Sequence, residues 1–138
     1  MTPPRLGVAL GAAAAGGILG SLARAGLTSW LPVSDAFPWT VFWINVVGSA
    51  VLASVPALAA VRRTPWLGVF LGTGVLGGFT TMSTASEQSV ALFEHHHVLT
   101  GVFYCAGTLA AAVAAVAAVG RWIPAPDRVA AEAAGVDE

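Results

Sequence analysis

Long apolar stretches without any charged residue dominate this chain, and the charges fall between them or near the ends. The charge-free intervals, each at least 18 residues long, cover residues 6–23, 36–61, 64–86 and 98–120. About 20 apolar residues, at a rise of roughly 1.5 Å per residue, cross the hydrocarbon core of a bilayer as a helix. The pattern therefore predicts an all-α membrane protein with four transmembrane helices, of which the first continues through Arg24 to about Leu31.

The composition also indicates a membrane protein rather than a soluble one. Only 9% of the residues are charged, whereas soluble domains carry about 25%, and 57% are hydrophobic. We expect one membrane domain over residues 1–123 and a polar cytoplasmic tail over residues 124–138. The chain has no Lys and a net charge of −1, so a nucleic-acid surface, which needs clustered cations, is not expected. The single Cys105 lies in an apolar run and is predicted to be a small buried hydrophobic side chain.

The basic residues indicate how the helices are oriented. Five of the six Arg fall on one side of the predicted bundle, namely Arg5, Arg62, Arg63, Arg121 and Arg128. The other side carries Asp35, Glu94 and three His, while Arg24 lies inside or near the end of the first helix. Because cytoplasmic loops collect Arg and Lys, we expect both termini in the cytoplasm and a multi-pass protein of the plasma membrane.

The third predicted helix is unusually rich in Gly, Ser and Thr at mid-bilayer depth, reading GTGVLGGFTTMSTASEQ from Gly72 to Gln88. Unsatisfied backbone groups are costly there unless they pack on protein or line a polar cavity. A break at Gly77 and Gly78 would free carbonyl oxygens that can bind a cation. The alternative is a continuous glycine-rich helix packed tightly on its neighbours, as the GxxxG spacing of Gly16 and Gly20 also allows.

Polar side chains in the second and fourth helices suggest a path for a small anion. Asn45 lies deep in the second helix, and Tyr104 and Thr108 share one face of the fourth because they are four residues apart. Amide and hydroxyl donors can replace the hydration shell of an anion in a narrow pore. Hydrogen bonds between helices are an equally good interpretation of each residue taken alone.

Three segments together resemble one family, the small four-helix fluoride channels called Fluc or CrcB. The first is GGILGSLAR, residues 16–24, similar to the family's GGxxGxxxR. The second is TVFWINVVGSAVLA, residues 40–53, similar to TLxVNxxGsFLLG, and the third is GTGVLGGFTTMST, residues 72–84, similar to GTGFxGGFTTFST. The face of Tyr104 on the fourth helix completes the resemblance, which covers nearly the whole chain up to Gly120.

The resemblance implies an antiparallel, dual-topology-type dimer with two fluoride pores and a structural sodium ion at its centre. By this resemblance, the main-chain carbonyls of Gly77 and Thr80 hold the sodium at the break in the third helix. The residues that would line the pore are Asn45, Ser83, Thr84, Tyr104 and Thr108.

The chain departs from the family pattern where aromatic ring edges would face the anion. Met82 and Ala85 stand in place of the two Phe of the family's FSTF motif, and neither can supply a ring edge. Gln88 stands at the position where the family has an acidic residue, and the acidic Glu87 lies one residue before it. We therefore assign the role of the family's acidic residue to neither. Two further hydroxyl positions of the pore are apolar here, Ala112 and Val116.

Three functions remain open at this point. The first is a channel subunit that exports fluoride passively as half of a heterodimer, and the second is a non-conducting partner that supplies only sodium ligands and a dimer surface. The third, a small multidrug-type antiporter, relies on a membrane-embedded Glu in the first helix, where this chain has only Arg24. An enzyme is not expected. A metal site at His95, His96 and His97 is not expected either, because adjacent side chains on a short loop do not converge.

The charge bias favours pairing with a second four-helix chain of opposite orientation. An antiparallel homodimer needs one sequence to insert both ways, and therefore a nearly even distribution of Arg across the membrane. Five Arg against one is far from even.

Overall fold

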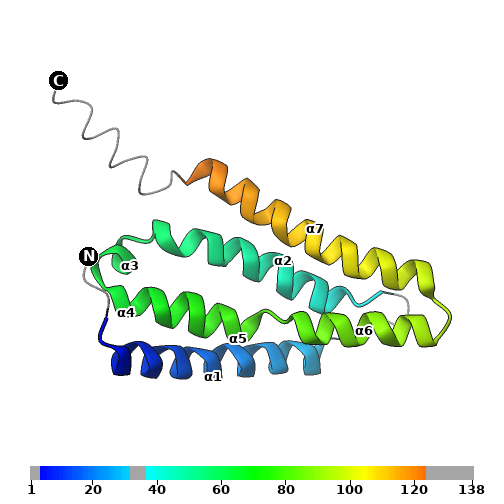
Figure 1. The fold of residues 1–138 in the computed structure, drawn as a ribbon, viewed down its shortest axis with the longest axis horizontal. Coiled ribbons are helices and arrows are strands. Elements are labelled where there is room, and N and C mark those ends of the chain that lie inside the picture. The colour runs from blue at the N-terminus through cyan, green and yellow to red at the C-terminus, as the bar shows by residue number, and fades with distance from the viewer. Residues whose placement is uncertain (1–3, 32–36, 124–138) are drawn as a thin grey trace.

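The computed structural model describes residues 4–31 and 37–123, and this part of the chain consists of helices joined by short turns, without a strand (Figure 1). Its elements, in chain order, are α1 (Leu6–Trp30), α2 (Trp39–Ser54), η1 (Val55–Ala57), α3 (Ala59–Arg63), α4 (Pro65–Gly68), η2 (Val69–Leu76), α5 (Gly77–Phe79), α6 (Met82–Glu94) and α7 (Val98–Trp122). Here η1 is a single 3₁₀ turn, and η2 is a π-helical stretch.

Four helical stretches in the described residues are long and apolar enough to cross a membrane, which confirms the predicted all-α membrane fold. They are α1, the second span Trp39–Ala57, the third span Pro65–Glu94 and α7. The end of α1 at Trp30 agrees with the predicted end near Leu31. Successive spans lie lengthwise across Figure 1 and run in alternating directions, so the chain forms an elongated bundle.

Four of the five arginines in the described residues lie toward one end of the bundle, as the sequence predicts, and the fifth, Arg24, lies within α1. The start of α1 after Arg5, the short α3 with Arg62 and Arg63, and the end of α7 at Arg121 all lie toward the same end of the bundle (Figure 1). Glu94 and the three His lie in the turn at the opposite end. Asp35, Arg128 and the predicted tail over residues 124–138 lie outside the described residues.

The third span is broken near its centre, as predicted, but the predicted position of the break is wrong. Gly77 has helical backbone angles, with φ −64° and ψ −35°. The break lies three residues further on, where Thr80 (φ −75°, ψ 151°) and Thr81 (φ −147°, ψ 121°) are extended. None of the described glycines has a positive φ, so the glycine pair is not there to allow unusual backbone angles.

Glycines instead let α1 and the third span approach each other at backbone distance. A Cβ atom on Gly16 or Gly20 would collide with the carbonyl oxygens of Phe70 and Val75, and one on Gly78 would lie 2.5 Å from the carbonyl oxygen of Gly17. The GxxxG spacing therefore serves packing inside the chain, where small residues permit close approach without a hydrophobic driving force.

The α2, α6 and α7 helices meet in a separate small core. Its buried members are Val41, Ala85, Leu92 and Tyr104, with Phe37 and Phe42 packed against them. The rings of Phe37 and Tyr104 meet edge to face, with centroids 5.2 Å apart. This core fixes α6 against α7 on the far side of the break from the glycine contacts.

Candidate functional site

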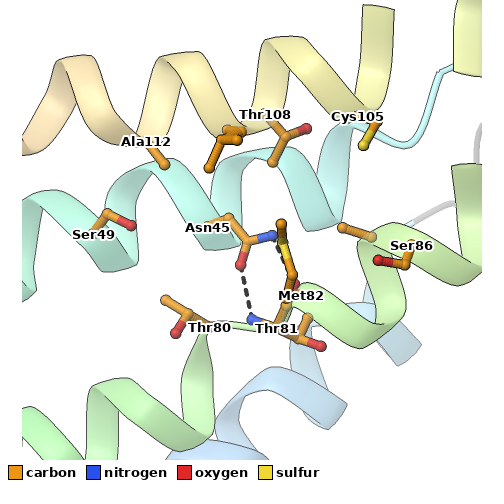
Figure 2. A pocket seen from close by; sticks show the side chains of 11 residues that line it. Asn45, Ser49, Thr80, Thr81, Met82, Ser86, Cys105, Thr108 and Ala112 are labelled. Carbon is orange, nitrogen blue, oxygen red and sulfur yellow. Dashed lines mark hydrogen bonds between the residues drawn. The ribbon is translucent and has the colours of Figure 1, made fainter. Parts of the chain in front are cut away.

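A cavity of about 220 Å³ lies beside the break, between α2, α6 and α7 (Figure 2). The residues that line it are Asn45, Ser49, Thr80, Thr81, Met82, Ala85, Ser86, Cys105, Thr108, Leu109 and Ala112. Among the residues predicted for a pore, the structure brings Asn45 and Thr108 together here, beside the altered positions Met82 and Ala85. Ser83, Thr84 and Tyr104 do not line this cavity.

Asn45 is hydrogen-bonded in both directions to the backbone of one residue across the cavity. Its Nδ2 donates to the carbonyl oxygen of Thr81 at 2.9 Å, and its Oδ1 accepts from the backbone N–H of Thr81 at 2.8 Å (Figure 2). The side chain is only 8% exposed. The backbone N–H of Thr81, at the residue that caps the start of α6, has no acceptor within the third span, so Asn45 satisfies it at the break.

Thr81 in turn begins α6. Its hydroxyl oxygen accepts from the backbone N–H of Thr84 at 3.2 Å, which is the standard side-chain cap of a helix start. The same hydroxyl donates to Oγ1 of Thr84 at 3.1 Å. Thr84 is therefore engaged in the cap and is half-buried, while the neighbouring Ser83 is exposed on α6 outside the cavity.

The last turn before the break is held from α1. Arg24 donates from Nε to the carbonyl oxygen of Gly78 at 3.3 Å, and the hydroxyl of Ser21 lies 3.5 Å from the same oxygen. The backbone N–H and the hydroxyl of Thr80 both donate to the carbonyl oxygen of Leu76 at 2.9 Å. Arg24, an expensive charge within a membrane span, thus has a backbone partner.

These bonds leave particular carbonyls of the break without a donor. Within the described part of the chain, no hydrogen bond reaches the carbonyl oxygens of Gly77, Phe79 and Thr80. Gly77 is exposed and Thr80 is half-buried. Neutral carbonyl oxygens suit a hard cation, so the donor set at Gly77 and Thr80 fits the sodium ion that the resemblance implies; its binding there stays a prediction.

On α7 the two hydroxyls predicted to line a pore, those of Tyr104 and Thr108, both donate hydrogen bonds to other groups of the protein. Tyr104 is fully buried, and its hydroxyl donates to Oε1 of Gln88 at 2.7 Å. Thr108 donates to the carbonyl oxygen of Tyr104 at 2.6 Å, one turn back in its own helix. The partner Gln88 was not assigned from the sequence. Residues 88 and 104 are eight positions either side of His96, and an antiparallel pair of helices brings such positions together.

The altered positions lie in different surroundings. Met82 is 60% exposed at the start of α6, whereas Ala85 is 5% exposed and belongs to the small core. A ring at position 85 would have to displace its neighbours in that core. Glu87 is exposed on α6.

Several residues of the cavity were missed or misjudged from the sequence, among them one cysteine and two serines. Cys105 is exposed and lines the cavity, so the prediction of a buried hydrophobic side chain is wrong. Ser49 and Ser86 also line it, and neither makes a side-chain hydrogen bond within the described residues. Ser49 follows Asn45 by four residues, one helical turn, and this spacing was the signal available in the sequence.

The three adjacent His close the turn between α6 and α7. His96 has φ 63°, a left-handed conformation that usually takes glycine. The backbone N–H of His97 donates to the carbonyl oxygen of Leu92 at 2.8 Å, and that of His96 to Phe93 at 3.1 Å, which together form a Schellman cap. No group of three or more His, Cys, Asp or Glu that could hold a metal ion occurs among residues 4–31 and 37–123.

Comparison with known proteins gives one consistent result. A family described as CrcB-like protein, Camphor Resistance (CrcB), matches residues 11–120. The fluoride-specific ion channel FluC 2 of Streptomyces avermitilis is 44% identical over 74% of this chain and 63% of its own length. FluC 1 of Streptomyces coelicolor is 42% identical over 75% of this chain and 69% of its own length. FluC of Rhizobium meliloti is 36% identical over 74% of this chain and 85% of its own length.

Proposed function

The chain belongs to the CrcB-like family, and we propose that it is a subunit of a fluoride-selective channel through which fluoride leaves the cytoplasm passively. The three relatives named above are called fluoride-specific ion channels. The observation that carries the proposal is the cavity beside the break, in which Asn45 and Thr108 share the wall with side chains that are free to donate.

The donors that remain available define the proposed path. Tyr104 and Thr108 give their hydroxyl protons to other protein groups. Ser49, Ser86 and Cys105 are not engaged in this way, and the Asn45 amide keeps one hydrogen that it does not give to Thr81. A narrow path lined by such neutral donors favours the smaller anion over chloride. The proposal includes no enzymatic step and no coupling to protons or nucleotides.

A structural sodium ion and a second subunit complete the proposal. Of the carbonyls around the break, those of Gly78 and Thr81 are occupied by donors from α1 and α2, while those of Gly77 and Thr80 are not. Two oxygens from one chain do not complete the shell of a cation. The remaining ligands would come from a second four-helix subunit that presents the same region across a two-fold or pseudo-two-fold axis.

The second subunit is proposed to be a different chain with the opposite orientation. In this proposal both termini, Arg62 and Arg63 lie on the cytoplasmic side of the plasma membrane. Each juxtamembrane basic residue contributes on the order of 1 kcal/mol at an anionic leaflet, so a bias of four residues favours one orientation by roughly 4 kcal/mol, close to a thousandfold. An inverted copy of the same chain would be too rare to form a homodimer.

A specific observation supports a second candidate function, that of a non-conducting structural partner. The ring positions carry Met82 and Ala85, and Ala112 and Leu109 make one side of the cavity apolar. A chain that keeps the carbonyls of Gly77 and Thr80 but has lost part of its anion path would still support pores lined mainly by its partner.

Fluoride efflux from liposomes, measured with a fluoride electrode, tests the proposal. The chain is reconstituted alone and together with a second four-helix chain of reversed Arg bias. We expect fluoride efflux without chloride efflux, and only in the paired sample. Equal chloride efflux, or dependence on a proton gradient, would refute a fluoride channel, and full efflux from the lone chain would refute the heterodimer. Efflux from the pair that survives replacement of the cavity residues of this chain would favour the structural partner.

A further inference from the structure

The break in the third span diverts two backbone hydrogens away from their helical acceptors. In a continuous helix, the N–H of Thr81 would donate to the carbonyl of Gly77, and the N–H of Thr84 to that of Thr80, because each acceptor lies four residues earlier. Instead, the Thr81 N–H goes to Asn45 Oδ1 at 2.8 Å, and the Thr84 N–H goes to Thr81 Oγ1 at 3.2 Å.

The two diversions free the same two carbonyls that the proposed sodium site requires. Asn45 also occupies the carbonyl of Thr81, and Arg24 occupies that of Gly78, so these oxygens are withdrawn from any ligand. The side chains around the break therefore select which oxygens stay open. Asn45 does this from a buried position, with 8% of its surface exposed, and it reaches across 36 residues of sequence.

We propose that Asn45 and the Thr81 hydroxyl are positioning residues for the cation site: by capturing the amide hydrogens of Thr81 and Thr84, they keep the carbonyls of Gly77 and Thr80 open for sodium. This inference rests on the sodium ion of the proposed function. This positioning role of Asn45 is distinct from donating a hydrogen bond to an anion in the cavity. Without these two acceptors, the third span would close into a continuous helix, and its carbonyls would pair internally.

Sodium-dependent thermal stability of the full-length chain, purified in mild detergent with the subunit it pairs with, tests this role without measuring transport. Sodium is titrated against potassium at constant ionic strength. We expect Thr81→Val, which keeps the shape of the side chain but removes the acceptor, to raise the sodium concentration for half-maximal stabilisation at least tenfold. Thr81→Ser restores the acceptor and should restore the response. Asn45→Leu should match Thr81→Val.

Thr108→Val is the matched control, because it removes a buried hydroxyl from the same cavity without touching the break. We expect its sodium response to equal that of the unaltered protein. If Thr81→Val also keeps that response, or if Thr108→Val loses it equally, the positioning role is wrong.

Amide hydrogen exchange of the unaltered protein provides a second measurement that needs no variant to fold. Sodium, but not potassium, should slow exchange at Thr81 and Thr84, because the ion fixes the open arrangement of the break. Absence of any sodium effect on stability and exchange would overturn the inference, while fluoride efflux by the same preparation would leave the channel proposal standing. A sodium response in a preparation without fluoride efflux would support the positioning role and count against the channel proposal.

Discussion

The two halves of the third span are held in the molecule by different kinds of contact. Before the break, the backbone of η2 and α5 packs directly against the backbone of α1. The contact occurs at glycines, because a side chain there would collide with the facing helix. After the break, α6 packs through side chains, with Ala85 in a small core and Gln88 bonded to Tyr104. We call the first half, η2 and α5, the frame, because its position is fixed by backbone contacts. Residues of the second half line the cavity, where a change of side chain does not disturb such contacts.

The largest effect is expected from adding one methyl group where α1 meets the frame. A Cβ on Gly20 would collide with the backbone of Val75, which has no flexible end that can move away. We expect Gly20→Ala to cost about 3 kcal/mol or more and to leave little folded protein. Gly26→Ala is the control, since nothing lies within 4 Å of its Cβ position in the same helix. The two variants are compared by thermal unfolding in detergent. Equal stability of the two would mean that the backbone contact between α1 and the third span does not determine the stability of the first half.

The second prediction concerns the cavity and uses the single Cys of the chain. Because Cys105 is exposed and lines the cavity, a neutral maleimide should react with it and fill the cavity of the proposed ion path. We expect fluoride efflux to fall by about tenfold or more after complete labelling, as in any narrow pore that is plugged. The Cys105→Ala variant should be insensitive to the reagent. Complete labelling without loss of efflux would place the ion path elsewhere.

A smaller effect is expected at the contact that fixes α6 on α7. Tyr104→Phe removes the hydroxyl that donates to Gln88 at 2.7 Å and leaves the acceptor on the half-buried Gln88 unpaired. We expect a loss of about 1–1.5 kcal/mol in the free energy of unfolding. The double variant with Gln88→Leu should lose less than the sum of the single variants, because the unpaired acceptor is gone. Strict additivity would mean that this hydrogen bond does not hold α6 on α7.

The smallest predicted effect is a gain in stability, at the turn between α6 and α7. His96 has φ 63°, so His96→Gly should raise the free energy of unfolding by about 0.5–1 kcal/mol. His95 is a matched control, because its φ of −84° favours any ordinary residue and glycine there should be destabilising. Thermal unfolding of both variants gives the comparison, and a loss of stability in His96→Gly would mean that the imidazole makes a contribution greater than the strain.

The same comparison explains which features the sequence predicted. The four spans follow from charge-free intervals because the bilayer constrains length and charge directly. The break was predicted because Gly, Ser and Thr at that depth need polar surroundings, but it was placed on Gly77 and Gly78. A sequence does not distinguish a glycine that bends the chain from one that lets another helix approach. Only the position of α1 shows that Gly78 has the second role.

The cavity was predicted in part for a related reason. Asn45 and Thr108 were identified because polar residues inside spans are costly and conspicuous. Their partners were not, since the acceptor of an amide or hydroxyl depends on the facing helix. The burial of Tyr104 and the exposure of Cys105, adjacent on α7, likewise depend on the rotation of that helix about its axis.

The glycine contact between α1 and the third span has a consequence for biosynthesis. Gly20 meets Val75, which is made 55 residues later. At roughly 5–20 residues per second of translation, α1 waits roughly 3–11 s in the membrane before its partner exists. During that interval its glycine face is open to lipid and to quality-control proteases. Burial of the glycine face of α1 therefore has to wait for the synthesis of the third span.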